Sequence, residues 1–171
     1  MKMNALVDGR CIRALYAASQ AGVRVDLCVR GICCLRPRVE GVSENIRVVS
    51  IVGRLLEHSR VYSFERDGEH TIYIASADLM PRNLDHRVEL AVPIDAPELK
   101  AELLEMLDKS FADNQGSWEL DGDGTWHRRV PGAGDEPRNM QLELVSLWAA
   151  RAAAERPAGE PDLLSATGLG G

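Results

Sequence analysis

Long apolar runs are missing from this sequence of 171 residues. No segment approaches the roughly 20 consecutive apolar residues that a membrane-spanning helix requires. The first ten residues, MKMNALVDGR, also lack the apolar stretch that a secretory signal carries. We therefore expect a cytoplasmic protein without a membrane span.

Cysteine is also scarce, with four in the chain. Cys28, Cys33 and Cys34 lie close together, but no His or Cys pair elsewhere completes the spacing of a zinc site. Four cysteines in a chain of this length are too few for a disulfide scaffold. The sequence predicts reduced thiols and no metal bound by this chain.

Lysine is scarce as well. The lysines are Lys2, Lys100 and Lys109. Residues 1–90 carry 13 Lys+Arg against 11 Asp+Glu, whereas residues 91–171 carry 7 against 15, and ten arginines but no lysine occur from Arg24 to Arg87. The planar guanidinium group matches phosphate oxygens in bidentate fashion, so this bias favours a phosphate ligand. A genome-wide preference for arginine codons explains the composition equally well. Only the positions of the arginines can distinguish this explanation from a phosphate ligand.

What is present is the pattern of a soluble globular protein, with 45% apolar and 27% charged residues. Asp8 is a candidate N-cap for an amphipathic helix that ends at Gly22, and residues 23–29 alternate as a strand does. The Asp-Gly pair at 67–68 is a hairpin turn signal. Further strands are predicted over 46–52, 61–64, 71–75 and 88–94, short extended pieces around Trp118 and Trp126, and helices over 95–113 and 139–155.

This order of elements predicts an α/β fold. Residues 30–45 form a long loop at the C-terminal end of the first predicted strand, where loops of open α/β sheets commonly bind ligands. We assign residues 1–156 to one domain. Residues 157–171 have neither apolar periodicity nor bulk, and we predict that they are disordered.

Four short segments near predicted strand ends carry residue types that bind or transfer phosphate. They are Glu57–Arg60, Ala75–Asp78, Met80–Arg87 and Val29–Gly31. In the first, His58 can act as a nucleophile towards phosphorus or as a general acid. Arg60, two residues further on, can clamp the transferred phosphate. Each segment alone is compatible with an ordinary surface loop, but their joint placement predicts a phosphate-binding site.

The other three segments contribute small residues and charge. Ser76 and its small neighbours let backbone and hydroxyl donors approach an anion. Arg82 and Arg87 can bind phosphate, and Asp85 is placed to orient one of these two guanidinium groups. Gly31 leaves room for a ligand beside Arg30. These assignments are the residue-level predictions for the site.

Four longer strings resemble the C-terminal end of bacterial polyphosphate kinase. They are KMNALVD (2–8), VRGICCLRP (29–37), SENIRVVSIVGRLLEHSRVY (43–62) and ASADLMPRNLDHRVE (75–89). That family makes inorganic polyphosphate by moving the terminal phosphate of ATP, reversibly. Its catalytic core has two lobes similar to the phospholipase D fold. The resemblance implies that this chain is the second lobe, a single α/β unit with a mixed sheet flanked by helices.

The resemblance also assigns residues. His58 is implied to be the second active-site histidine, which contacts the transferred phosphate and protonates the leaving oxygen or stabilises a phosphohistidine on the other lobe. Arg30 and His58 match positions that contact ATP, and Arg87 matches an arginine that faces the phosphates. The His-x-Arg at 58–60 corresponds to the His-x-Lys of the phospholipase D superfamily, and residues 76–78 correspond to its Gly-Ser-x-Asn portion.

Three positions depart from the family pattern. Ala75 replaces a usual Gly, and its methyl group is expected to crowd the phosphate pocket. His86 replaces a usual Arg, which removes a permanent charge. Leu55 replaces a usual Phe, which we interpret as a tolerable change in the core.

The resemblance finally implies what lies elsewhere. In the family, the phosphorylated histidine, the magnesium-binding segments and the adenine-contacting parts lie upstream of the position of Met1. We expect ATP or ADP and inorganic polyphosphate as ligands, no nucleic acid, and Mg²⁺ as a cofactor of the intact enzyme with no ligand in this chain. Activity is expected to need the N-terminal lobes or assembly of several copies.

Two alternatives stay open at this point. The chain can be a non-catalytic remnant that only binds polyphosphate. It can also be the half-site of a phospholipase D-type phosphodiesterase built from two identical chains. Arg60 in place of Lys and Asp78 in place of Asn argue against the second alternative.

Overall fold

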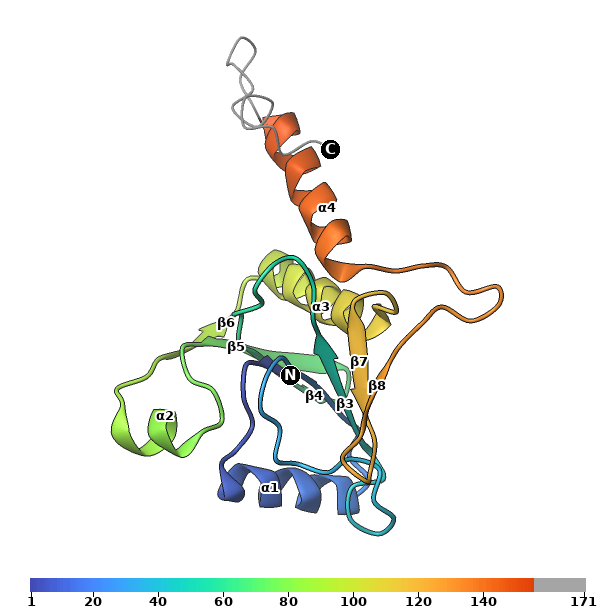
Figure 1. Cartoon of the computed structure of the whole chain (residues 1–171). Coiled ribbons are helices and arrows are strands. Elements are labelled where there is room, and N and C mark those ends of the chain that lie inside the picture. Colours follow the sequence, from blue (N-terminus) through green and yellow to red (C-terminus); the bar gives the residue numbers. More distant parts are fainter. Residues whose placement is uncertain (156–171) are drawn as a thin grey trace. The chain divides into compact units, whose positions relative to one another are not determined.

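The computed structural model describes residues 1–155, and within them eight strands form one mixed sheet (Figure 1). The strand order is β6-β5-β4-β1-β2-β3-β7-β8. The strands are β1 (Lys2–Met3), β2 (Val25–Val29), β3 (Ile46–Ile51), β4 (Val61–Arg66), β5 (Glu69–Ala75), β6 (Ala91–Ile94), β7 (Ser117–Leu120) and β8 (Trp126–Arg128). The helices are α1 (Gly9–Gln20), α2 (Pro81–His86), α3 (Pro97–Ala112) and α4 (Met140–Glu155).

The chain divides into two compact units, Met1–Gln141 and Leu142–Gly171. The first unit contains the whole sheet together with α1, α2 and α3. The described part of the second unit is the helix α4 from Leu142 onward. None of the helices in residues 1–155 has the length and apolarity that crossing a bilayer would require.

Helices α1 and α3 cover opposite faces of the sheet (Figure 1). Side chains of a strand alternate between the two faces, which separates two clusters of apolar residues. The cluster under α1 contains Met3, Leu6, Ile12, Leu15, Val25, Leu27, Val29, Leu35, Ile46, Val48 and Leu120. The cluster under α3 contains Val61, Ile72 and Leu107. Both faces of the central strands are therefore buried, as in α/β folds generally.

The strand directions bring several strand ends together. Strands β1, β2 and β3 run parallel, β4 runs antiparallel to β1, and β5 runs antiparallel to β4. The C-terminal ends of four strands and the N-terminal end of β4 therefore share one edge of the sheet, which we call the carboxyl edge. It is defined by Met3, Val29, Ile51, Val61 and Ala75.

Most of the predicted elements are confirmed. Asp8 caps α1, because its carboxylate accepts hydrogen bonds from the backbone N–H groups of Arg10 and Cys11, both at 2.9 Å. The hairpin turn has positive φ at both Asp67 and Gly68, as its two-residue type requires. The α/β class with a mixed sheet flanked by helices is also confirmed.

Three local features of the structure differ from the sequence-based expectation. Residues 81–86 form the short helix α2, where no helix was predicted, with Pro81 in its first turn. Strand β6 begins at Ala91 rather than at Val88, whose side chain is 98% exposed. Strand β1 was not predicted, since two residues are too few to show periodicity. The predicted tail at 157–171 lies outside the described residues.

The close approach of Gly31 to the chain after β1 generates a stability prediction. The Gly31 N–H donates to the carbonyl of Asn4 at 2.8 Å, and a Cβ on Gly31 would lie 3.0 Å from that oxygen. Gly31→Ala is expected to lower the free energy of unfolding by about 1–3 kcal/mol because backbone must move. Urea denaturation measures the change.

Gly116→Ala is the matched control, because its nearest new contact is an ordinary 3.6 Å to the carbonyl of Val52. The control should change the free energy of unfolding by less than about 0.5 kcal/mol. Equal effects of the two substitutions would contradict the packing argument.

Candidate functional site

Asp78 joins three segments at the carboxyl edge. Its side chain is 6% exposed and accepts backbone hydrogen bonds from Asn4 at 2.7 Å and Ala5 at 3.3 Å. It also accepts from Arg60, at 3.0 Å from both Nε and Nη2. The chain after β1, the chain before β4 and the chain after β5 therefore meet at one carboxylate.

The surroundings of this carboxylate favour its charged form on balance. Burial by itself disfavours its charge, but the hydrogen bonds and charge of Arg60 and the backbone N–H of Asn4 outweigh that effect. The pKa of Asp78 consequently lies below its ordinary value. A buried carboxylate with this many donors is a structural anchor.

Arg60 occupies a different place from the predicted phosphate clamp. Nε and Nη2 contact Asp78, and Nη1 lies 3.3 Å from the carbonyl oxygen and 3.4 Å from Nδ1 of His58. Its side chain is 13% exposed, whereas His58 is exposed. Arg60 is therefore engaged inside the protein and supports His58, and the prediction that it clamps phosphate is wrong.

A second set of buried contacts anchors the segment that leads to His58. Glu57 forms an ion pair with the buried Lys2 at 2.8 Å and accepts from Nε2 of Gln141 at 2.7 Å. The same amide group bonds both the N–H and the carbonyl of Leu55, at 2.9 Å and 2.7 Å. A Cβ on Gly53 would lie 2.4 Å from Oε1 of Gln141, so glycine leaves space for this amide.

Sequence reasoning missed Lys2 and Gln141 as parts of the site. Each lies far from Glu57 along the chain, and the string KMNALVD that begins with Lys2 assigns that lysine no partner. The available signal for Lys2 was that lysine is rare in this chain. A lysine that is buried needs a carboxylate partner, and that partner is Glu57. Leu55, which was predicted to be a core residue, is 50% exposed, so that prediction is wrong.

Ser76 also differs from its prediction. Its hydroxyl donates to the carboxylate of Glu89 and accepts from the N–H of Leu90 at 3.0 Å. Hydrogen bonds from Ser76 and Asn83, followed by the charges of Arg87 and Arg60, lower the pKa of Glu89. The Ser76 hydroxyl is therefore committed to an anionic side chain of the protein and is not free for another anion.

Asp85 and Gly31 likewise have other partners than predicted. Asp85 forms an ion pair with Arg10 of α1 at 2.6 Å, which ties α2 to α1, instead of orienting a neighbouring arginine. The space beside Gly31 is filled by the carbonyl of Asn4 and not left for a ligand. Both residues were predicted to lie beside a ligand. In the structure they make contacts that hold the protein together.

The predicted ligand-binding residues Arg30, His58 and Arg87 border the carboxyl edge on separate segments. The backbone of Arg30 is fixed at the end of β2, with its N–H on the carbonyl of Met3 at 3.2 Å and its carbonyl accepting from Ser50 at 3.1 Å. Arg87 follows α2 and lies close enough to Glu89 to lower the pKa of that carboxylate. Among residues 1–155, no hydrogen bond or ion pair joins any two of these three side chains.

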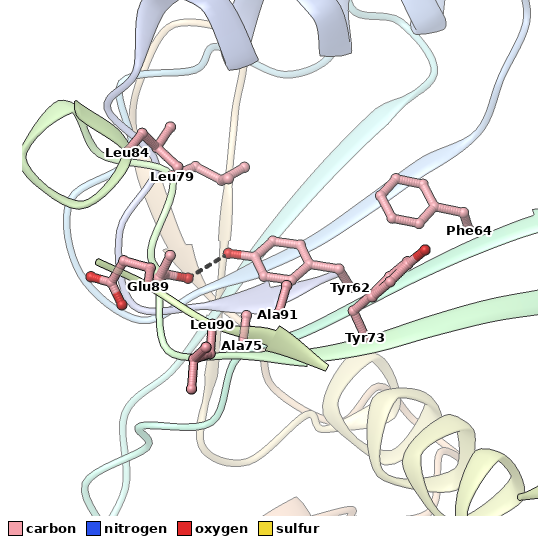
Figure 2. A pocket seen from close by; sticks show the side chains of 10 residues that line it. Tyr62, Phe64, Tyr73, Ala75, Leu79, Leu84, Glu89, Leu90 and Ala91 are labelled. Carbon is pink, nitrogen blue, oxygen red and sulfur yellow. Dashed lines mark hydrogen bonds between the residues drawn. The ribbon is translucent and has the colours of Figure 1, made fainter. Parts of the chain in front are cut away.

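An apolar pocket of about 380 Å³ lies beside the carboxyl edge (Figure 2). It is lined by Tyr62, Phe64, Tyr73, Ala75, Ala77, Leu79, Leu84, Glu89, Leu90 and Ala91. Figure 2 shows the aromatic rings of β4 and β5 opposite Leu79 and Leu84. Burial raises the pKa of Tyr62, so its hydroxyl keeps the proton that it donates to the carbonyl of Ala77 at 2.9 Å.

The lining of this pocket contains no basic side chain, so it does not suit a phosphate group. Ala75, which was expected to crowd the phosphate pocket, places its methyl group here instead. Arg30, which follows β2, and Arg87, which follows α2, are not among the residues that line it. The pocket therefore suits an apolar group.

Comparison with known proteins identifies the relatives of this chain. The family model for the polyphosphate kinase C-terminal domain 2 matches residues 1–141. The polyphosphate kinase of Synechocystis sp. is 55% identical over 164 residues, which are 96% of this chain and 22% of that protein. The polyphosphate kinase of Pseudomonas aeruginosa is 50% identical over 149 residues, which are 87% of this chain and 22% of that protein.

A solved structure agrees with these matches. The crystal structure of polyphosphate kinase from Porphyromonas gingivalis superimposes with a TM-score of 0.84 at 37% identity, covering 90% of this chain and 23% of that one. The chain thus spans about a fifth of the length of the relatives that it matches.

The depressed pKa of Asp78 predicts a specific acid sensitivity. A carboxyl whose folded pKa lies below its unfolded value, about 3.9, stabilises the fold fully above that value and loses its contribution as pH falls through the folded pKa. The difference in unfolding free energy between the wild type and Asp78→Asn should be largest near about pH 6 and shrink towards about pH 3. Urea denaturation across this range measures it, and a constant difference would contradict the assignment.

Proposed function

The chain belongs to the polyphosphate kinase family, and on that premise we propose that it forms one half of a site for reversible transfer of the ATP terminal phosphate to inorganic polyphosphate. The observation that supports this most strongly is the shared edge of the sheet, where Arg30 follows the end of β2, His58 precedes the start of β4 and Arg87 precedes the start of β6. The implied phospholipase D-like character of the lobe is part of the same proposal.

The proposed chemistry rests on positioning and charge. Phosphoryl transfer needs little covalent help from protein groups, but it needs the charge on the phosphate oxygens to be neutralised. Arg30 and Arg87 supply guanidinium groups from two different segments, and His58 presents its ring to the transferred phosphate. Asp78 and Arg60 do not touch the phosphate, because they neutralise each other.

Mg²⁺ is the cofactor that the family resemblance implies, and the residues of this chain do not fit it. Mg²⁺ prefers free carboxylate oxygens. Near the carboxyl edge, Asp78 accepts from Arg60, and Glu89 accepts from Ser76 and Asn83. In the described part of the chain, no group of three His, Cys, Asp or Glu side chains is placed to hold a metal ion. We propose that the Mg²⁺ ligands belong to other parts of the intact enzyme.

The other half of the site also has to come from elsewhere. Since the chain spans about a fifth of its relatives, we propose that the group that carries the phosphoryl intermediate belongs to the N-terminal portion or to another chain. ATP or ADP and polyphosphate are the proposed substrates. A cytoplasmic location goes with this proposal because ATP is the phosphoryl donor.

Transfer activity tests the proposal. Phosphate exchange between ATP and polyphosphate is measured for this chain alone and after fusion to the N-terminal four-fifths of the Synechocystis enzyme. Activity only in the fused protein is the expected result. Polyphosphate affinity without exchange in either protein would favour the non-catalytic remnant, and hydrolysis of a simple phosphodiester by the chain alone would favour the phospholipase D-type alternative.

His58→Ala in the fused protein is expected to lower exchange by at least about 100-fold, because the imidazole faces the transferred phosphate. The free energy of unfolding should change by less than about 0.5 kcal/mol, because the side chain is exposed. Unfolding of the variant would show that the histidine is structural, and unchanged exchange would remove it from the site.

Arg30→Lys is expected to weaken ATP binding about tenfold, because a point charge does not replace a bidentate guanidinium. Isothermal titration of the fused protein measures the affinity. The matched control is Arg66→Lys, since Arg66 is 91% exposed on the β4–β5 hairpin, away from the carboxyl edge. Equal affinities of wild type and Arg30→Lys would exclude Arg30 as a ligand.

A further inference from the structure

We infer that Arg60 and Asp78 are positioning residues that hold the His58 ring with its proton on Nε2, so that His58 serves as a neutral hydrogen-bond donor to the phosphate. The inference deepens the proposed function and rests on it for the identity of the ligand. Its structural part concerns only residues of this chain. It assigns His58 neither the role of phosphoryl acceptor nor that of general acid.

The first step is the rigidity of the pair. Two parallel hydrogen bonds of 3.0 Å join the guanidinium to the carboxylate, and both side chains are largely buried. Charge-assisted bidentate pairs of this kind have a fixed relative orientation. Backbone donors from Asn4 and Ala5 fix the carboxylate from the other side. The third guanidinium nitrogen, Nη1, is therefore held in one place.

The second step is the direction of the hydrogen bond to the ring. Nη1 of Arg60 lies 3.4 Å from Nδ1 of His58. A guanidinium group has only donors and keeps its charge at any ordinary pH, so Nδ1 can only accept. A ring nitrogen that accepts carries no proton, and the proton of the neutral ring therefore stands on Nε2. The same Nη1 reaches the carbonyl of His58 at 3.3 Å and so fixes the backbone from which the ring projects.

The third step is chemical. With the Nδ1 lone pair engaged by Arg60 and Nε2 protonated, the ring has no free lone pair to attack phosphorus. Full loss of the Nε2 proton would leave an imidazolate, so the proton is shared with a phosphate oxygen and not transferred. A neutral imidazole that donates in this way stabilises developing negative charge. No covalent bond to His58 forms or breaks in this role.

The test is the tautomer of His58 in the isotopically labelled chain, read from long-range ¹H–¹⁵N NMR spectra at about pH 8, where an ordinary histidine is neutral. The wild type should show a single form, with Nε2 protonated and Nδ1 unprotonated. Arg60→Met and Asp78→Asn should each give a mixture of tautomers. His86, at the exposed end of α2, is the internal control and should not change.

Arg60→Lys keeps the test interpretable if the other two variants misfold. Lysine keeps the charge and can pair with Asp78, but its single ammonium group cannot also reach Nδ1 as the guanidinium does. The fold should be retained and the tautomer mixture should still appear. A proton on Nδ1 in the wild type, or an unchanged single tautomer in folded Arg60→Lys, would overturn the inference.

Kinetics separate positioning from direct binding. In the fused protein, Arg60→Lys should lower kcat at least about tenfold and leave KM for ATP within about twofold, because Arg60 contacts His58 and not the nucleotide. A raised KM with unchanged kcat would make Arg60 a substrate ligand and overturn the assignment. The NMR result needs no substrate, so failure of the proposed function would be seen separately as absence of exchange in the fused wild type.

Discussion

The ion pair between Arg60 and Asp78 is the interaction on which the carboxyl edge depends. It ties the chain before β4 to the chain after β5, and the two backbone N–H groups bonded to Asp78 add the chain after β1. Removing one partner of a buried pair leaves an uncompensated charge, which typically costs about 3–5 kcal/mol. Replacing either Arg60 or Asp78 alone is therefore expected to destabilise the carboxyl edge.

Four acidic side chains near the edge have partners within the protein. Asp78 is paired with Arg60, Glu57 with Lys2, and Asp85 with Arg10, while Glu89 accepts from a serine and an asparagine. Three of these carboxylates are neutralised by a cationic partner, whereas Glu89 keeps its negative charge. Within residues 1–155, the side chains of Arg30 and Arg87 are not drawn into any of these pairs. Because unpaired carboxylates would oppose the binding of an anion, the three ion pairs favour the proposed site.

Local sequence signals were sufficient for most of the fold and for only part of the site. The Asp8 cap, the Asp-Gly turn and the long helix over 97–112 depend on neighbouring residues, and these were predicted correctly. The partners of Asp78 lie as far as 74 residues away, so no window of sequence reveals them. The same limit explains why Asp85 was assigned to a nearby arginine although it pairs with Arg10, 75 residues away.

An NMR titration of the ¹⁵N-labelled chain with tripolyphosphate tests the central claim most directly. If the strand ends form one anion site, the side-chain signals of Arg30, His58 and Arg87 will shift together along a single binding curve, and those of Arg66 will stay unchanged. Separate curves for the three residues, or shifts that match those of Arg66, would contradict a common site at the carboxyl edge.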